Sequence, residues 1–141
     1  MNVLAVDPGP HVGLAWINDE GDFFAVEYTP ESAYEMLPNW IAWADVIVCE
    51  EFVIKGDRAR EANVTIEMIG VVKYLCKLQD AKLVMQLPGE GIGFSTSEKL
   101  KRVGWWQRGG SDHARAASKH LLLYCVKNGI ISADRVLESS S

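Results

Sequence analysis

The order of apolar and polar residues in the first half of the chain is that of short strands separated by tight turns. An apolar run over residues 2–6 stops at Asp7-Pro8-Gly9, and apolar segments follow over 12–17 and 23–28, on either side of a polar turn. Apolar runs of this length, bounded by turn residues, predict strands. Two later runs have the same character. We therefore predict five strands, over residues 2–6, 12–17, 23–28, 45–52 and 82–86.

Apolar residues at intervals of three and four predict helices between and after the later strands. The clearest case is 61–79, and a second long helix is predicted over 112–128. Thr29-Pro30 is typical of a helix start, and Pro38 predicts a break or kink in the helix that follows. A short basic helix is predicted over 96–104.

The order of these elements is β-β-β-α-β-α-β-α, which predicts an α/β fold with a mixed five-stranded sheet and helices packed on it. The first three strands form an antiparallel meander, and the first strand lies beside the fourth. Residues 87–94, with three Gly and one Pro, are predicted as a loop. At 141 residues, the chain is expected to form one domain over 1–138 with a disordered tail over 139–141.

The composition is that of an ordinary globular protein, with 48% hydrophobic and 23% charged residues. No apolar run is long enough to cross a bilayer, and no signal peptide is visible, so no membrane association is expected. The three cysteines, Cys49, Cys76 and Cys125, are widely spaced in apolar surroundings. They predict reduced thiols in a cytoplasmic protein, without a metal or redox pair.

The net charge of −5 conceals an uneven distribution, because residues 1–54 contain no Lys or Arg and all 14 basic residues follow. Overall acidity argues against a nucleic-acid partner. That argument is weak where acids bind metal and the basic residues cluster elsewhere, as they do over 99–119. Solvated helix faces are the alternative interpretation of this basic segment.

Three acidic residues are candidates for chemistry. Asp7 and Glu50 end two strands that should be neighbours, so their carboxylates are expected to converge, and Asp112 opens the last long helix. Each has a structural alternative: a turn residue for Asp7, a solvated strand end for Glu50 and a helix cap for Asp112. Clustered carboxylates repel one another unless a cation lies among them, and oxygen ligands favour Mg²⁺ or Mn²⁺ over zinc.

These residues lie in segments that resemble the RuvC-type Holliday-junction resolvases of the ribonuclease H-like superfamily. Residues 3–9 followed by Gly13-Leu14-Ala15 resemble the first strand pair of that family, and 48–52 resemble its central strand, with Glu50 matching the catalytic glutamate. Residues 63–72 resemble its next helix. Residues 86–88 and 97–106 resemble bacteriophage-encoded members in particular. Asp112-His113-Ala114-Arg115 opens the helix that carries the family's last metal-binding acids.

The resemblance implies a ribonuclease H-like fold and a metal-dependent endonuclease that resolves four-way and other branched DNA junctions, in the cytoplasm of a host if phage-encoded. It implies two Mg²⁺ or Mn²⁺ ions per site and no small-molecule cofactor. The implied catalytic and metal-binding residues are Asp7, Glu50, Asp112 and His113. His113 would bind metal or orient water, with a solvated imidazole as the alternative. His120, deep in the same helix, is expected to be a packing residue.

Basic and aromatic residues of the 99–115 segment are the candidate DNA contacts, because cations bind phosphate and aromatic rings stack on unpaired bases. They are Lys99, Lys101, Arg102, Trp105, Trp106, Arg108 and Arg115. For both tryptophans, a place at the edge of the core is the alternative. The resemblance also implies a homodimer, for which the predicted surface is the Met68, Ile69 and Val72 side of the 61–79 helix, unless that side packs in the core.

The sequence departs from the family pattern at one position. The family's last motif consists of His or Asp, any two residues, and then Asp-Ala. Here His113 and two further residues are followed by Ala116-Ala117, so Ala116 stands where the family has an acid. The change indicates a variant in which Asp112 supplies the charge, a disabled site or an engineered substitution, and it predicts weakened cleavage. A non-catalytic junction-binding module is therefore the second hypothesis. A ribonuclease H-like nuclease acting on RNA or an RNA–DNA hybrid is the third.

Overall fold

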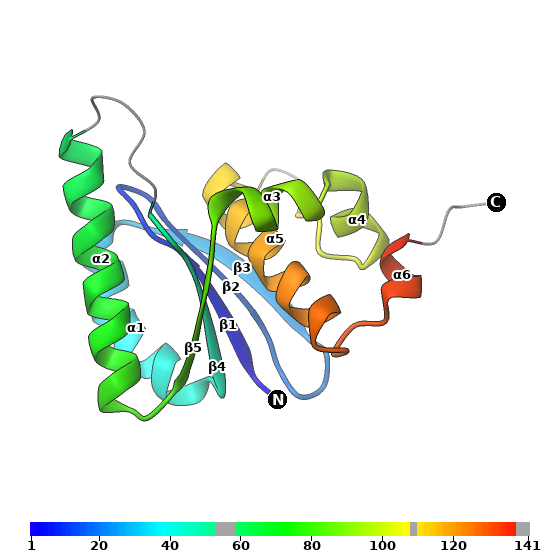
Figure 1. Cartoon of the computed structure of the whole chain (residues 1–141), viewed down its shortest axis with the longest axis horizontal. Helices are drawn as coiled ribbons and strands as arrows, with labels where there is room; N and C mark the ends of the chain where they lie inside the picture. The colour runs from blue at the N-terminus through cyan, green and yellow to red at the C-terminus, as the bar shows by residue number, and fades with distance from the viewer. Residues whose placement is uncertain (53–58, 108–109, 138–141) are drawn as a thin grey trace.

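The computed structural model of the chain describes residues 1–52, 59–107 and 110–137. Its centre is a five-stranded sheet in the order β3-β2-β1-β4-β5 (Figure 1). The strands are β1 (Val3–Asp7), β2 (Val12–Ile17), β3 (Phe23–Tyr28), β4 (Val46–Glu50) and β5 (Lys82–Gln86). All five lie within one or two residues of the predicted bounds, which confirms the strand prediction.

The sheet is mixed, as the element order predicts. β1 pairs antiparallel with β2, and β2 with β3, so the first three strands form the predicted meander. β1 pairs in parallel with β4, and β4 with β5. The predicted neighbourhood of the first and fourth strands is thereby confirmed.

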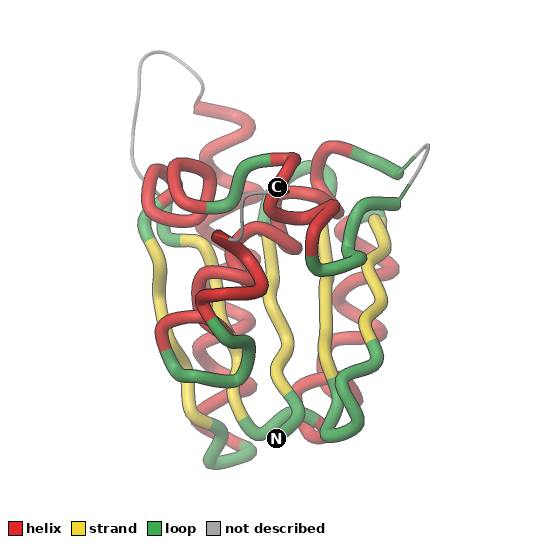
Figure 2. The backbone as a smooth tube through the Cα atoms, turned by 90° about the vertical axis from the view of Figure 1, so that its right-hand side faces the viewer, coloured by secondary structure: helices red, strands yellow, loops and turns green. Residues whose placement is uncertain are grey.

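Helices cover both faces of this sheet (Figures 1 and 2). One face packs on α1 (Pro30–Trp43) and α2 (Ala59–Leu78) through alternate strand residues such as Leu4, Leu14 and Ile47. The other face packs on α5 (Asp112–Lys127) through the intervening residues, such as Ala5, Ala15 and Val48. Because strand side chains alternate between faces, both cores follow from one apolar pattern.

Two predictions about local structure are wrong. The predicted loop over 87–94 is the helix α3 (Pro88–Phe94), since Pro88 occupies the first helical position and the Glu90 carboxylate accepts from the Leu87 N–H. Helix α1 is continuous across Pro38, because Leu37 and Ile41 anchor the turns on either side in the core. The basic helix is α4 (Ser97–Arg102), capped by Thr96, and the chain adds an unpredicted α6 (Ala133–Leu137).

The apolar side of α2 lies in the core. Met68, Ile69 and Val72 are buried against the sheet, so they are not available as the predicted dimer surface, and the core-packing alternative holds. The larger apolar side chains that α2 exposes are Ile66, Tyr74 and Leu78.

The three cysteines are free and buried, as predicted. None of the helices described is both long and apolar enough to cross a membrane. The predicted tail over 139–141 lies outside the described residues.

Candidate functional site

Three neighbouring strands end in polar side chains at one edge of the sheet. Asp7 ends β1, Glu50 ends β4 and Gln86 ends β5. The parallel register pairs Val6 with Cys49 and Glu50 with Gln86, so all three residues lie at one level. They continue the rows of alternate residues that face α5. The predicted convergence of Asp7 and Glu50 therefore follows from strand order and register.

Asp7 is the more buried of the two acids, with 8% of the residue exposed. Burial, and next the negative charge of Glu50, raise the pKa of the Asp7 carboxyl from 3.8 to about 7, although His120 acts in the opposite direction. His113 Nδ1, from the first turn of α5, lies 3.4 Å from Asp7 Oδ2. The His113 side chain is half exposed, so this pair lies where the edge opens to solvent.

Glu50 meets a second histidine of α5. His120 Nε2 lies 2.6 Å from Glu50 Oε2, and His120 Nδ1 lies 2.7 Å from Gln86 Oε1. The residue is fully buried, as expected of a packing residue, but both ring nitrogens face polar partners of the site. Neither His120 nor Gln86 was predicted to be a site residue. Two signals could have identified them: His120 follows His113 by two helical turns, and Gln86 ends an apolar strand exactly as Glu50 does.

A glycine brings α5 close to this edge. A Cβ atom at Gly13, in β2, would lie 1.9 Å from the backbone oxygen of His113. Only a residue without a side chain allows the first turn of α5 to rest on the sheet here. Gly13 thus helps to place His113 beside Asp7.

Asp112 is not part of this cluster. Ser111, rather than Asp112, caps α5, because the Ser111 hydroxyl accepts from the Ala114 N–H. The Asp112 side chain is 95% exposed and pairs with Arg115 at 3.3 Å. The structure therefore does not bring the third predicted acid to Asp7 and Glu50.

The donors at this edge suit one hard cation. Within the described parts of the chain, no three His, Cys, Asp or Glu side chains are arranged to hold a metal ion. Asp7, which is buried, and Glu50, which is partly buried, nevertheless form a mutually repelling carboxylate pair, and this repulsion adds to the effect of burial in raising the pKa of Asp7. Mg²⁺ is commonly bound by one or two carboxylates while water or substrate phosphate fills its other positions. The pair fits such an ion, and position 116 supplies no further acid because it is Ala.

Three of the predicted DNA contacts gather around one ring. Lys101 Nζ lies 4.9 Å from the centre of the Trp106 ring, and Arg115 Cζ lies 4.4 Å from it. Trp106 is half-buried and Lys101 is exposed. Such a cluster combines positive charge with an aromatic surface.

The other predicted contacts are used differently. Trp105 is 5% exposed and stacks on Phe23, so its ring belongs to the core and is not available to a base. Lys99 donates to the Phe94 carbonyl, and Arg102 donates to the Val136 carbonyl, so both tie neighbouring helices together. Arg108 lies outside the described residues. Burial thus contradicts the predicted DNA contact for Trp105. The bonds of Lys99 and Arg102 to backbone carbonyls leave these two side chains less available to phosphate.

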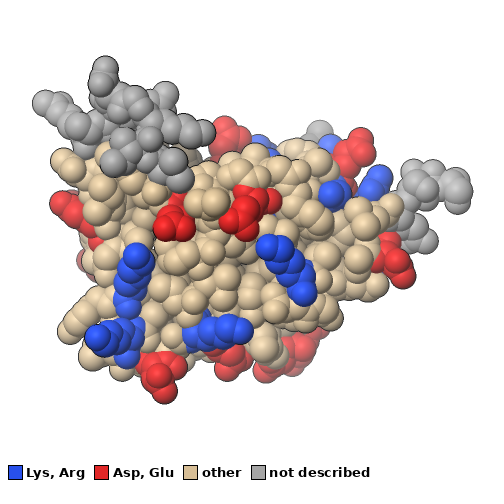
Figure 3. All heavy atoms as spheres, in the orientation of Figure 1, with Lys and Arg blue, Asp and Glu red and all other residues tan. Residues whose placement is uncertain are grey.

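Basic and acidic side chains alternate on one face of the molecule. On the face seen in Figure 3, Lys and Arg side chains are scattered among Asp and Glu side chains rather than joined in one basic patch.

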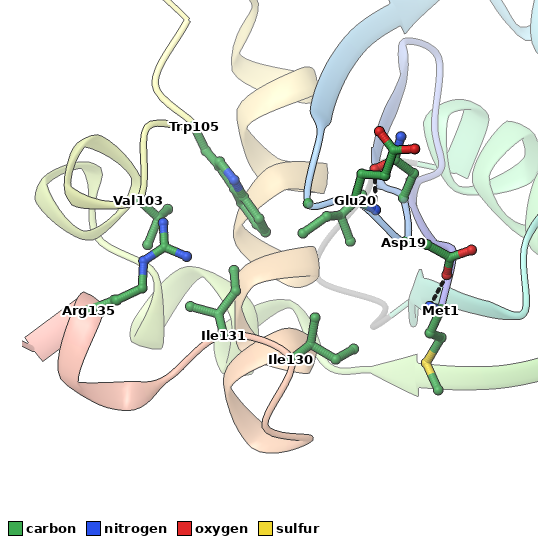
Figure 4. A pocket seen from close by; sticks show the side chains of 11 residues that line it. Met1, Asp19, Glu20, Val103, Trp105, Ile130, Ile131 and Arg135 are labelled. Atoms are coloured by element: carbon green, nitrogen blue, oxygen red, sulfur yellow. Dashed lines mark hydrogen bonds and ion pairs between the residues drawn. The ribbon is translucent and has the colours of Figure 1, made fainter.

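A separate hollow of about 320 Å³ lies at the opposite edge of the sheet. Trp105, Val103 and Arg135 line one side, and the turn with Asp19 and Glu20 lines the other (Figure 4). It shares only Trp105 with the predicted site residues, so it is not part of the Asp7–Glu50 edge.

The mixed five-stranded sheet with helices on both faces is the RuvC, ribonuclease H-like fold. Two structures of Thermus thermophilus RuvC share it. The structure of T. thermophilus RuvC in complex with a Holliday junction substrate matches with a TM-score of 0.68 and 12% sequence identity, over 92% of this chain and 96% of that chain. A second structure of Thermus thermophilus RuvC matches with a TM-score of 0.60 and 15% identity, over 92% of this chain and 97% of that chain. Neither a family model nor a curated protein matches this sequence.

Proposed function

We propose that this protein is a divalent-metal-dependent endonuclease that cleaves four-way and other branched DNA junctions. The observation that carries the proposal is the convergence of Asp7 and Glu50 at one sheet edge, where burial and mutual repulsion raise the pKa of Asp7 to about 7. The similarity of the fold to a RuvC protein bound to a Holliday junction supports the choice of substrate.

Asp7 and Glu50 would hold one Mg²⁺ or Mn²⁺ ion at this edge. Such an ion, when bound, activates water and stabilises the charge that develops on a phosphodiester. His113, half exposed and beside Asp7, is placed to bind the same ion or to orient water. Asp112, the third acid of the predicted set, does not reach this edge to hold a second ion, because it is exposed and faces Arg115.

Lys101, Trp106 and Arg115 would contact the DNA. The two cations lie close to one half-buried ring, so phosphate contact and base stacking can occur at the same place. The homodimer, the cytoplasmic location and the likeness to bacteriophage-encoded members remain predictions, as does the domain range 1–138. For a dimer, the exposed Ile66, Tyr74 and Leu78 of α2 replace the buried residues first predicted.

The direct test is nicking of a synthetic four-way junction in Mg²⁺ and in Mn²⁺. Asp7→Asn should lower the cleavage rate at least about 100-fold, since it removes a charged metal ligand worth several kcal/mol in the transition state. Asp45→Asn is the matched control, because Asp45 precedes β4 at the opposite edge, where it accepts from the Asn2 N–H. Equal cleavage by wild type and Asp7→Asn would refute the proposal.

The second candidate function is junction binding without cleavage. Ala116 and the exposed Asp112 favour it, because both leave α5 without an acid at the site. Gel shifts with and without chelator, run beside the nicking assay, separate the two functions. Binding alone predicts salt-sensitive, junction-selective shifts with no product in either metal. If Ala116→Asp creates or strongly increases cleavage, the natural site is a weakened nuclease; if it stays inert, the catalytic proposal loses its support.

A further inference from the structure

The imidazole of His120 is enclosed on several sides. Glu50 and Gln86 face its two ring nitrogens at 2.6 and 2.7 Å, and no part of the residue is exposed. Helix α3 closes over the ring, because a Cβ atom at Gly91 would lie 2.4 Å from Nδ1. A ring held this closely has one position, so the atom that it presents to Glu50 is fixed.

Burying a polar ring costs free energy unless the ring is hydrogen-bonded, and an apolar side chain could fill this position in the core without that cost. Leu121 and Leu122, the next two residues of α5, are equally buried and apolar. An ionised Glu50 carboxylate is only an acceptor, so Nε2 is the donor in the contact. The hydrogen bond from His120 therefore constrains the flexible side chain of Glu50, whose carboxylate interacts with that of Asp7.

His120 lies one helical turn after Ala116, the position at which the sequence departs from the family pattern. α5 thus contacts the sheet edge through two histidines seven residues apart, His113 toward Asp7 and His120 toward Glu50. Each of the two acids has its own imidazole from the same helix.

We infer that His120 is a positioning residue: its Nε2 holds one oxygen of Glu50 and thereby orients the carboxylate for a divalent cation shared with Asp7. The cation in this inference rests on the proposed function, whereas the hydrogen bond between His120 and Glu50 is observed in the structure. Outer partners of metal-binding carboxylates typically contribute 10- to 100-fold to metal affinity.

Mn²⁺ binding by calorimetry, without DNA, tests this role. His120→Leu should weaken binding at least about tenfold, whereas His120→Gln, whose amide nitrogen can reach the place of Nε2, should restore most of it. Ser118→Ala is the matched control, because Ser118 is also buried on α5 but bonds to the Ala114 carbonyl instead. If His120→Leu binds Mn²⁺ as tightly as wild type and Ser118→Ala, the inference is overturned.

Two additions keep the outcome clear. If His120→Leu does not fold, His120→Gln and His120→Asn are compared, since the shorter Asn amide reaches the place of Nδ1; equal Mn²⁺ affinities then overturn the inference. In the metal-free protein, nuclear magnetic resonance should detect a slowly exchanging ring N–H of His120 that shifts upfield in Glu50→Gln. Without that response the hydrogen bond is refuted. If the response is present but wild type binds no Mn²⁺, the proposed metal site fails while the Glu50–His120 contact stands.

Discussion

The same five strands present different side chains to the helices on their two faces. Toward α1 and α2, the central strands offer apolar residues along their whole length, ending in Val6 and Cys49. Toward α5, the rows begin with apolar residues and end in Asp7, Glu50 and Gln86. Both faces are covered by helices, so the difference is not one of exposure to water.

The burial of polar groups makes the row facing α5 informative. Each of these polar groups costs free energy in the core unless another group compensates it. Gln86 and Glu50 meet His120, and Asp7 meets His113, whereas the negative charges of Asp7 and Glu50 still repel each other. The α1–α2 face contributes to stability alone, whereas the α5 face combines stability with a pair of mutually repelling carboxylates suited to a cation.

The largest expected effect concerns pH. Because the pKa of Asp7 is about 7 in the folded state and 3.8 ordinarily, the folded protein holds this proton to higher pH than the unfolded chain. The free energy of unfolding should therefore fall between about pH 4 and pH 7, by at most about 4 kcal/mol from this group. Urea unfolding of wild type and Asp7→Asn across this range measures it, and the variant should lack this part of the decline. Parallel pH curves for the two proteins would contradict the assignment.

The apolar face is tested by Leu37→Ala in α1. Leu37 is fully buried, so its truncation should lower the free energy of unfolding by about 2–5 kcal/mol. Mn²⁺ affinity of the folded variant should stay within about threefold of wild type, because Leu37 packs on the α1–α2 face whereas the side chains of the edge face α5. A tenfold loss of affinity in well-folded protein would show that the two faces are not independent.

Close approach of α5 is tested by Gly13→Ala. The added methyl group meets the His113 backbone oxygen, so the start of α5 must shift, at a cost of about 1–3 kcal/mol. Gly70→Ala is the control: nothing lies near that position in α2, and removing a helical glycine should stabilise by about 0.5–1 kcal/mol. Thermal unfolding shows whether each variant is less or more stable than the wild type. A neutral Gly13→Ala would mean that α5 does not rest on β2 as described.

The smallest effect is expected for Lys101→Ala. Loss of one phosphate contact should weaken junction binding by less than about 1 kcal/mol and reduce the slope of log affinity against log salt by about 1. Lys82→Ala, at the start of β5 on the opposite edge, should change neither quantity. Fluorescence anisotropy with a labelled junction at several salt concentrations measures both. An unchanged slope in Lys101→Ala would remove the Trp106 cluster from the DNA surface.

Much of the fold could be predicted because the apolar pattern is strongly local. Strands such as 12–17 and 23–28 have the predicted bounds, since turn residues delimit them on both sides. The helix α3 was not predicted because its three glycines favour a loop. The signals for a helix start, Pro88 at the first helical position and Glu90 accepting from the Leu87 N–H, were not recognised. The burial of Met68 and Trp105 depends on which helix covers which face, and the local sequence does not determine that.

The candidate site was predictable where strand order alone decides it. Asp7 and Glu50 converge because β1 and β4 are neighbours in register. The packing role of His120 was predicted, but its contact with Glu50 and the exposure of Asp112 were not, because both residues are on α5, whose rotation about its axis depends on contacts such as that of Gly13 with His113. That rotation directs His120 to Glu50 and leaves Asp112 exposed beside Arg115.

The central claim is that Asp7 and Glu50 share a divalent ion at the edge of the sheet. A crystal structure of the wild-type protein grown with Mn²⁺, with anomalous scattering recorded to locate the metal, tests it most directly. We predict an anomalous peak in contact with both carboxylates, with Glu50 still bonded to His120. A map with no peak at this edge, and with the two carboxylates turned apart, would contradict the account.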